Sequence, residues 1–385
     1  MASRRITSII VAHVLMLCWA VAAADGAPQY NIIALDVLPG GLDSLAFGLN
    51  DVGQVVGDSR KDTSGNVGQS RPVVWDYSGT PHELWSEQQF GGSGGNLADI
   101  NNAGQVVGRY GSGSGIVQPT PGVLPGRAFV WSADSGRIDL SLDPFGFSMA
   151  AAINEHGQVA GTSEILDPVT FELVGIHPFL WDATSGIRDL GTLGGGAAFA
   201  ADINALGQVV GYSEDAEGYT HAFVWDEANG MRELPSIAGG GSRATAINDL
   251  GQVLGGESGV GAFIWDAING MQTIPVGGYA LNNRGQVVGG AVGGLAIWDR
   301  TNGARFLADL IPTDTGWQLE IPFAINDAGD IVGYGLLNGK IRGFIMTPVP
   351  EPGSSQLCLF AIAFTAVLGR HRRVACGRAI GQPSN

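Results

Sequence analysis

Few residues of this chain stand in an arrangement that is typical of catalysis. The sequence has no nucleophile elbow, no zinc-type pair of histidines and no phosphate-binding loop. The acidic segment SEDAEG at residues 213–218 has the carboxylates of a Ca²⁺-binding loop but not the ligand spacing. The sequence therefore predicts no catalytic, cofactor-binding or metal-ligating residues, and no cofactor.

Two carboxylates, Asp99 and Asp202, hold positions that could support acid–base chemistry. Each stands two residues before a recurring asparagine, in the segments LADIN and AADIN. Carboxylates from separate segments can act as the acid and base of glycoside hydrolysis without leaving a sequence signature. The equivalent segments FGLN, AAAIN, ATAIN, YALN and FAIN carry no acid, which favours a binding or structural role over catalysis.

The recurring asparagine belongs to a motif with seven copies, of which AINDLGQVLGG at 246–256 is one. The copies are about 46 residues apart on average, near the length of a four-stranded propeller blade. Asparagine suits the start of a type I turn, and the glycine of the motif suits a position with positive φ. The motif therefore predicts the same hairpin corner in every repeat. Its asparagines are Asn50, Asn101, Asn154, Asn204, Asn248, Asn282 and Asn326.

Each repeat contains four short runs that read as strands, for example 244–248, 252–256, 261–267 and 270–276. The third run, as in HAFVWD and GAFIWD, is apolar on both faces, which indicates a strand buried on both faces. Radially packed blades bury their sheets in this way. We therefore expect the tryptophans of this run to lie in the core between blades: Trp75, Trp131, Trp181, Trp225, Trp265 and Trp298.

The chain has seven candidate fourth strands, but one of them lies before the first repeat and none follows the last. Six follow a third strand, whereas the seventh, IIALDVLPGG at 32–41, precedes every repeat, and the last repeat ends at Met346. The sequence thus predicts an all-β, seven-bladed β-propeller over residues 30–347, closed by the N-terminal strand as the outer strand of the last blade. An open solenoid is the alternative.

This region resembles the bacterial HAF repeat, most closely in HAFVWD at 221–226 and RDLGTLGGG at 188–196. The resemblance implies an extracellular protein and carries no activity with it. The histidine of the repeat is present only at His177 and His221, so a ring of metal-binding histidines is excluded.

The N-terminal residues 1–24 read as a secretory signal peptide. Arg4 and Arg5 precede an apolar run from Ile9, and a small-residue cleavage site ends at Ala24. An N-terminal membrane anchor is the alternative.

The C-terminal end divides into a PEP motif and linker at 348–356, a short transmembrane helix at 357–369 and a basic cytoplasmic tail at 370–385. This order resembles a PEP-CTERM sorting signal, which implies processing by an exosortase-type membrane protease. The helix would hold the chain in the membrane until then. The residues that carry the resemblance are Pro350, Glu351, Pro352, Arg370, Arg372 and Arg373.

The charge of the chain limits its partners. Residues 25–369 carry 14 basic and 36 acidic residues, a formal charge of −22, which argues against binding nucleic acid or an anionic membrane surface. Cys18, Cys358 and Cys376 all lie in the terminal segments, so the body has no disulfide framework.

Two functions fit these observations. The first is a non-catalytic binding or structural protein of the cell surface or extracellular matrix, with a polysaccharide or matrix protein as partner. The second is an extracellular polysaccharide hydrolase or lyase with carboxylates in the central channel.

Overall fold

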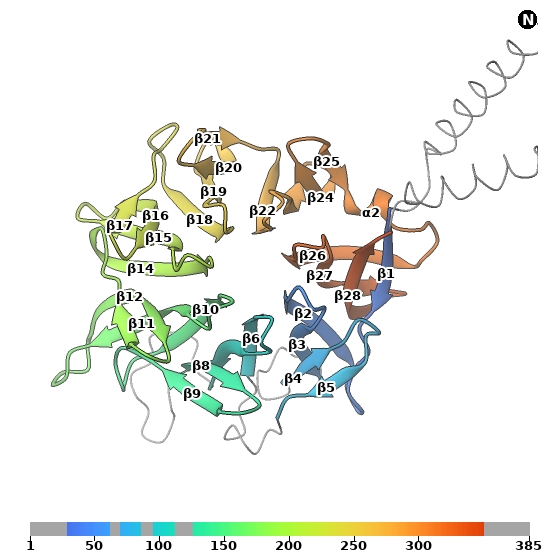
Figure 1. The fold of residues 1–385 in the computed structure, drawn as a ribbon, viewed down its shortest axis with the longest axis horizontal. Coiled ribbons are helices and arrows are strands. Elements are labelled where there is room, and N and C mark those ends of the chain that lie inside the picture. The colour runs from blue at the N-terminus through green and yellow to red at the C-terminus, as the bar shows by residue number, and fades with distance from the viewer. Residues whose placement is uncertain (1–28, 62–69, 86–94, 112–125, 350–385) are drawn as a thin grey trace, which may run out of the picture. The chain divides into compact units, whose positions relative to one another are not determined.

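The computed structural model describes residues 29–61, 70–85, 95–111 and 126–349. The chain divides into two compact units, residues 1–347 and 348–385. The described part of the first unit is all-β, with a single helical turn at α2 (Leu307–Leu310). It has the propeller architecture, with sheets arranged radially around a centre (Figure 1).

The strands form five separate sheets of four strands and one sheet of eight within the described residues. Consecutive strands pair antiparallel, with the first strand of each repeat at the centre of the ring (Figure 1). We number the repeats from 1 to 7 along the chain. Repeat 1 comprises β2 (Asp43–Leu49), β3 (Val55–Arg60), β4 (Ser70–Trp75) and β5 (Pro81–Glu83). Repeat 2 comprises β6 (Gly95–Ile100), β7 (Val106–Tyr110), β8 (Arg127–Ser132) and β9 (Gly136–Leu140).

Repeats 3 and 4 together make up the eight-stranded sheet. Each is an antiparallel set of four strands, and a single parallel pair, Ile176 with Ala197, joins β12 to β14. The strands are β10 (Ser148–Ile153), β11 (Val159–Leu166), β12 (Leu173–Asp182), β13 (Gly186–Asp189), and β14 (Gly194–Ile203), β15 (Val209–Asp215), β16 (Thr220–Asp226), β17 (Gly230–Glu233).

Repeats 5 and 6 return to separate four-stranded sheets. They comprise β18 (Ser242–Ile247), β19 (Val253–Glu257), β20 (Gly261–Asp266), β21 (Gly270–Thr273), and β22 (Val276–Leu281), β23 (Val287–Ala291), β24 (Gly294–Asp299), β25 (Gly303–Phe306).

Repeat 7 takes its outer strand from the other end of the body. Its sheet has the order β1 (Tyr30–Ala34), β28 (Lys340–Pro348), β27 (Ile331–Leu337), β26 (Trp317–Ile325). The N-terminal strand therefore occupies the position that the strand count predicts.

The N-terminal strand is shorter than the apolar run at 32–41 suggests. It ends at Ala34, after which the chain crosses toward repeat 1. The Leu35 amide still donates to Gly343 O at 2.8 Å, but the Leu35 carbonyl accepts from Ser44 Oγ at 2.7 Å. Trp75 Nε1 then donates to Asp36 O at 2.7 Å. The run after Ala34 thus bridges the last and first repeats instead of extending the ladder.

The core is a series of apolar layers between neighbouring repeats. On β16, Phe223 and Trp225 pack against repeat 3, whereas Ala222 and Val224 pack against repeat 5. This is the two-faced burial that the third run predicts, and it explains why its residues do not alternate in polarity.

The tryptophans are less uniformly buried than we expected. Trp75 and Trp225 are 0% and 3% exposed, but the other four are half-buried. The residue two positions earlier is the deeper anchor, because the tryptophan stands at the end of the strand beside a surface hairpin. These fully buried residues include Phe129, Phe179, Phe223 and Phe263.

The terminal segments lie outside the described residues. This applies to the predicted signal peptide at 1–24, to the segments 357–369 and 370–385, and to the PEP motif at 350–352. Among the residues that the structure describes, no helix has the length and apolar character needed to cross a bilayer.

Candidate functional site

The first-to-second-strand turns of the seven repeats meet at the centre of the ring. There they line a cavity of about 200 Å³. The lining includes six of the seven motif asparagines, all but Asn101, and six carboxylates: Asp51, Asp99, Glu155, Asp202, Asp249 and Asp327. This is the place where the repeat concentrates polar groups, and it is the first candidate for a functional site.

The asparagines form a closed cycle of hydrogen bonds. Each side-chain amide donates from Nδ2 to the main-chain carbonyl of the next asparagine around the ring, at 2.9–3.2 Å. The last link joins Asn326 to Asn50 O over 276 positions of sequence. The asparagines are buried, so each link satisfies groups that water does not reach. The cycle excludes the open solenoid.

Each asparagine also shapes its own turn. Asn204 Oδ1 accepts from the amides of Leu206 and Gln208 at 3.1 and 3.0 Å, and the Gly207 amide donates to Asn204 O. Gly207 has φ +73°, a backbone conformation that favours glycine. The predicted hairpin corner is therefore present, and the same side chain serves both the turn and the cycle.

The glutamine that follows the turn glycine has a role that sequence reasoning missed. Its Oε1 accepts from the asparagine of its own repeat, as Gln105 does from Asn101 at 2.8 Å. It also lies against the turn glycine of the next repeat, since a Cβ at Gly157 would lie 2.8 Å from Gln105 Oε1. The contact is tightest at Gly157 and looser elsewhere, since a Cβ at Gly104 or Gly251 would lie 3.9 or 3.8 Å from the neighbouring glutamine oxygen.

A second, outer set of contacts links the residues that directly follow the asparagines. Asp51, Asn102, Asp249, Asn283 and Asp327 exchange hydrogen bonds between neighbouring repeats, such as the Asp327 amide to Asp51 Oδ1 at 3.0 Å. Ala205 of repeat 4 has no side-chain acceptor for the preceding repeat, but its amide donates to Asp249 Oδ1 of repeat 5 at 2.8 Å. The sequence signal for this set was the recurrence of Asp, Asn or Glu directly after the motif asparagine in six of the seven repeats.

Asp99 and Asp202 lie deeper in the cavity and are held by the backbone. Asp99 accepts from the Ile100 amide and, across the repeat boundary, from the Ile153 amide at 3.1 Å. Asp202 does the same with Ile203 and with Ile247, at 2.8 Å each. A β-bulge precedes each aspartate on its strand and turns its side chain toward the next repeat.

Burial changes the acidity of both groups. It raises the pKa of Asp99 to about 6 and that of Asp202 to about 7, against the opposing effect of the two backbone hydrogen bonds. Among the described residues, no three His, Cys, Asp or Glu side chains lie close enough together to hold a metal ion. The cavity is acidic, but its carboxylates are spread around the ring.

The seventh repeat closes the ring with different residues. Asp330 replaces the glutamine, and it accepts from Asn326 Nδ2 at 3.0 Å and from the Tyr77 hydroxyl of repeat 1 at 2.8 Å. The Tyr77 ring lies over the turn of Gly53. Burial and the bond to Asp330 raise the pKa of Tyr77 to about 12. The join between first and last repeats therefore has a contact of its own.

The acidic segment at 213–218 is a hairpin turn. Asp215 accepts from the amides of Glu217 and Tyr219 at 3.0 and 2.8 Å, and His221 Nε2 lies 2.8 Å from Asp215 Oδ2. The other histidine of the repeat, His177, contacts Asp189 at 2.8 Å. Within the segment, these contacts engage the carboxylate of Asp215.

No family model matches the chain, and no curated protein matches it. Solved structures do. A streptogramin B lyase is 11% identical with a TM-score of 0.50, over 83% of this chain and 98% of that one. Virginiamycin B lyase from Staphylococcus aureus is 11% identical with a TM-score of 0.49, over 84% and 100%. A gluconolactonase from Xanthomonas campestris is 12% identical with a TM-score of 0.40, over 85% and 93%. Similarity at this level of sequence identity shows the propeller fold alone. The evidence for that fold is the first of these structures, whose TM-score is 0.50.

Proposed function

We propose that this chain is an exported, non-catalytic β-propeller of seven blades that binds a polysaccharide or a matrix protein at the cell surface or in the extracellular matrix. Each repeat, 1 to 7, is one blade. The signal peptide at 1–24 exports the body. The PEP motif, apolar helix and arginines at its other end direct an exosortase-type protease to it.

Two observations support the count of seven blades. The asparagine cycle has one member from each repeat. The eight-stranded sheet is held together by a single parallel residue pair, whereas the strands within repeats 3 and 4 form continuous antiparallel ladders. The two halves of this sheet therefore act as neighbouring blades, which share one ladder pair and otherwise pack through side chains.

The main support for a non-catalytic role is the hydrogen bonding of Asp99 and Asp202. Both oxygens of Asp99 and of Asp202 accept backbone amides, one from the aspartate's own repeat and one from the next. A carboxylate fixed in this way joins repeats together, and moving it to act on a substrate would break one of these links.

The competing function is a polysaccharide hydrolase or lyase that uses the same two carboxylates. The raised pKa values of Asp99, about 6, and Asp202, about 7, favour it, because acid–base catalysts work best near the ambient pH.

A glycan array probed with the purified full-length chain separates the two functions. The binding protein retains glycans and leaves their lengths unchanged, and Asp99→Asn and Asp202→Asn proteins that remain folded bind as the parent does. Shortened or unsaturated products that disappear in either variant would establish the enzyme and overturn our proposal.

A further inference from the structure

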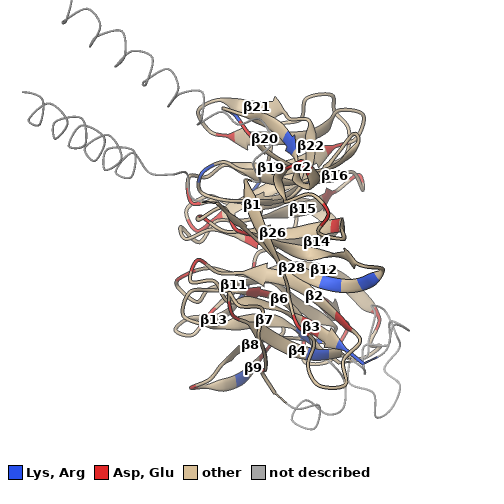
Figure 2. Ribbon diagram, turned by 90° about the vertical axis from the view of Figure 1, so that its right-hand side faces the viewer, with Lys and Arg blue, Asp and Glu red and all other residues tan. Residues whose placement is uncertain are grey.

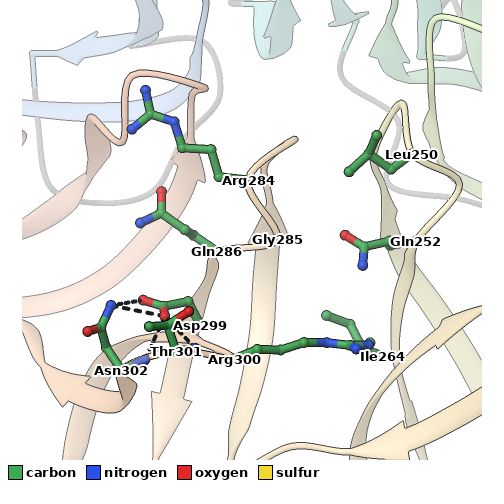
Figure 3. A pocket seen from close by; sticks show the side chains of 10 residues that line it. All are labelled: Leu250, Gln252, Ile264, Arg284, Gly285, Gln286, Asp299, Arg300, Thr301 and Asn302. Carbon is green, nitrogen blue, oxygen red and sulfur yellow. Dashed lines mark hydrogen bonds between the residues drawn. The ribbon is translucent and has the colours of Figure 1, made fainter. Parts of the chain in front are cut away.

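A cleft of about 350 Å³ lies between repeats 5 and 6, outside the central cavity. Its walls are the strand turns at Leu250–Gln252 and Arg284–Gln286, and its floor is the hairpin Asp299–Asn302 with Ile264 behind it (Figure 3). The volume falls within the range of small-molecule sites.

A matching cleft of about 360 Å³ lies between repeats 2 and 3. It is lined by the equivalent residues of those repeats, including two glutamines, the turn glycine and the hairpin after a third strand. The two clefts differ in charge. Where the first has Arg284 and Arg300, the second has His156 and Ala183. The cleft itself is thus a feature of the repeat. The two guanidinium groups are particular to repeat 6, which has arginine at both of these positions.

These arginines stand out in an acidic body. Among the described residues, Lys and Arg occupy few positions of the ribbon, whereas Asp and Glu are spread along it (Figure 2). Arg300 extends across the cleft toward repeat 5, where its NH2 lies 3.6 Å from Asp266 Oδ2 (Figure 3). Arg284 is exposed at the rim, and its guanidinium points away from Arg300 toward repeat 7, where it donates to Ala328 O at 3.3 Å (Figure 3). Asp299, the acid within the lining, has its oxygens occupied by Thr301, Asn302 and Arg305.

The remaining polar groups of the cleft are neutral. Gln252 and Gln286 use Oε1 to accept from Asn248 and Asn282, which leaves the donor ends of the two amides for other partners. Asn302 donates its Nδ2 to Asp299, so its Oδ1 is the acceptor that remains, and Thr301 adds an exposed hydroxyl. Neutral donors and acceptors beside two guanidinium groups match a ligand with several hydroxyls and one carboxylate.

We propose that this cleft binds a uronic acid unit of an extracellular polysaccharide. Arg300 holds the carboxylate, Arg284 adds positive charge at the rim, and the two glutamines, Thr301 and Asn302 hold the hydroxyls. The inference rests on the proposed binding function and assigns it a site and a ligand class. A contiguous run of acidic side chains fits less well, because a polyanion without hydroxyls would leave the glutamine, threonine and asparagine groups without partners.

The test is a binding titration of the full-length chain with a short oligomer of galacturonic acid and with the same oligomer methyl-esterified. We expect the free acid to bind and the ester to bind at least tenfold more weakly, since esterification removes the charge. Arg300→Ala should weaken binding of the acid about tenfold or more, and Arg284→Ala should weaken it less, because Arg284 lies at the rim. Arg300→Lys should recover part of it, because lysine keeps the charge but not the two-pronged geometry.

The equivalent cleft supplies the control. His156→Ala, at the position of Arg284 in repeat 3, should bind the acid oligomer as the parent does, with melting temperatures compared for every variant. Equal binding of acid and ester, or parental binding by folded arginine variants, overturns the cleft assignment while leaving a binding propeller. Arginine-dependent binding of polyglutamate alone would assign the cleft to acidic proteins and overturn the polysaccharide proposal. Absence of binding both to the glycan array and to immobilised matrix proteins would overturn the proposed function itself.

Discussion

At the scale of single residues, the motif asparagine combines a local and a long-range task. Its oxygen accepts from its own turn, and its nitrogen donates to the next repeat. The local task is readable in the sequence, because turn chemistry depends on neighbours along the chain. The long-range task is not, because the carbonyl that accepts from Asn204 belongs to Asn248, 44 residues later.

Replacing one ring asparagine should destabilise the whole body. Asn204→Ala leaves the Gln208 amide without its partner, at about 1–3 kcal/mol, and removes one of the two hydrogen bonds to the Asn248 carbonyl, which keeps the Gly251 amide. Denaturant unfolding measures the loss. Asn229→Ala, which removes an exposed turn asparagine bonded to Asp226, is the matched control and should cost less than about 1 kcal/mol. Equal costs for the two variants would contradict a structural role for the cycle.

The buried carboxylates predict the pH dependence of stability. The folded pKa values of Asp202 and Asp58, about 7 each, lie above the ordinary aspartate value near 4. Between these limits the folded state binds more protons than the unfolded state, so stability falls as pH rises from about 4 to 7. Melting temperatures at pH 5, 6, 7 and 8 should decrease in that order. Asp202→Asn should flatten the decrease, and a slope equal to the parent's would refute the assignment.

At the scale of strands and turns, the sequence predicted most of the sheet structure. It predicted less of the local pairing irregularities and of the burial of individual side chains. The third strands, the hairpin corners and the outer position of the N-terminal strand all follow from periodicity and counting. The β-bulge before Asp99 and Asp202 did not, since a bulge depends on pairing with the second strand. The partly exposed tryptophans were missed for a related reason: an apolar run shows that a strand is buried without showing where it reaches the surface.

The glycine of the motif offers a test of contacts between elements. Gly157 and Gly186 have nearly the same backbone, φ +76° and +75°, but only Gly157 faces a neighbouring side chain, Gln105. Gly186→Ala should therefore cost the strain of a left-handed alanine, about 1–2 kcal/mol. Gly157→Ala should cost measurably more, because Gln105 must also move. Chemical denaturation measures the free energy of unfolding of both variants. Equal losses would contradict a contact between Gln105 and the turn of Gly157.

At the scale of the whole molecule, the two ends of the body meet. The amide of Gly343 donates to Ser44 Oγ, and Arg342 contacts Leu42 O, both about 300 positions away in sequence. Tyr77 and Asp330 add the contact that is particular to this join. The circular arrangement thus depends on repeat 1, repeat 7 and the N-terminal strand together.

A disulfide can test this join directly. A Cβ placed on Gly343 would lie 3.5 Å from the Cβ of Leu35, within the range of disulfide geometry. In a chain whose three native cysteines are replaced by serine, Leu35→Cys with Gly343→Cys should form an intramolecular disulfide. The mobility on a non-reducing gel should change accordingly. Reduced or only intermolecularly linked cysteines in the folded monomer would contradict closure.

The proposed sorting signal is tested by its removal. A chain that lacks residues 350–385 should appear in the medium, because those residues contain the predicted C-terminal anchor. Fractionation of cells and medium measures this. Pro350→Ala with Glu351→Ala is the matched variant, since it keeps the apolar segment and should leave the chain in the membrane fraction unprocessed. A truncated chain that stays with the membrane would contradict the anchor assignment.

The asparagine cycle has a consequence for how such a chain can be rearranged. Every hydrogen bond in it points the same way around, from one repeat to the next, so the cycle has no first and no last member. A circular permutant that begins at the connection between β17 and β18 would restore the same cycle, provided that a linker joined the original ends. Duplicating or deleting one repeat would likewise change the circumference without orphaning an asparagine. The gene can thus gain or lose units while the centre of the protein keeps its hydrogen bonds.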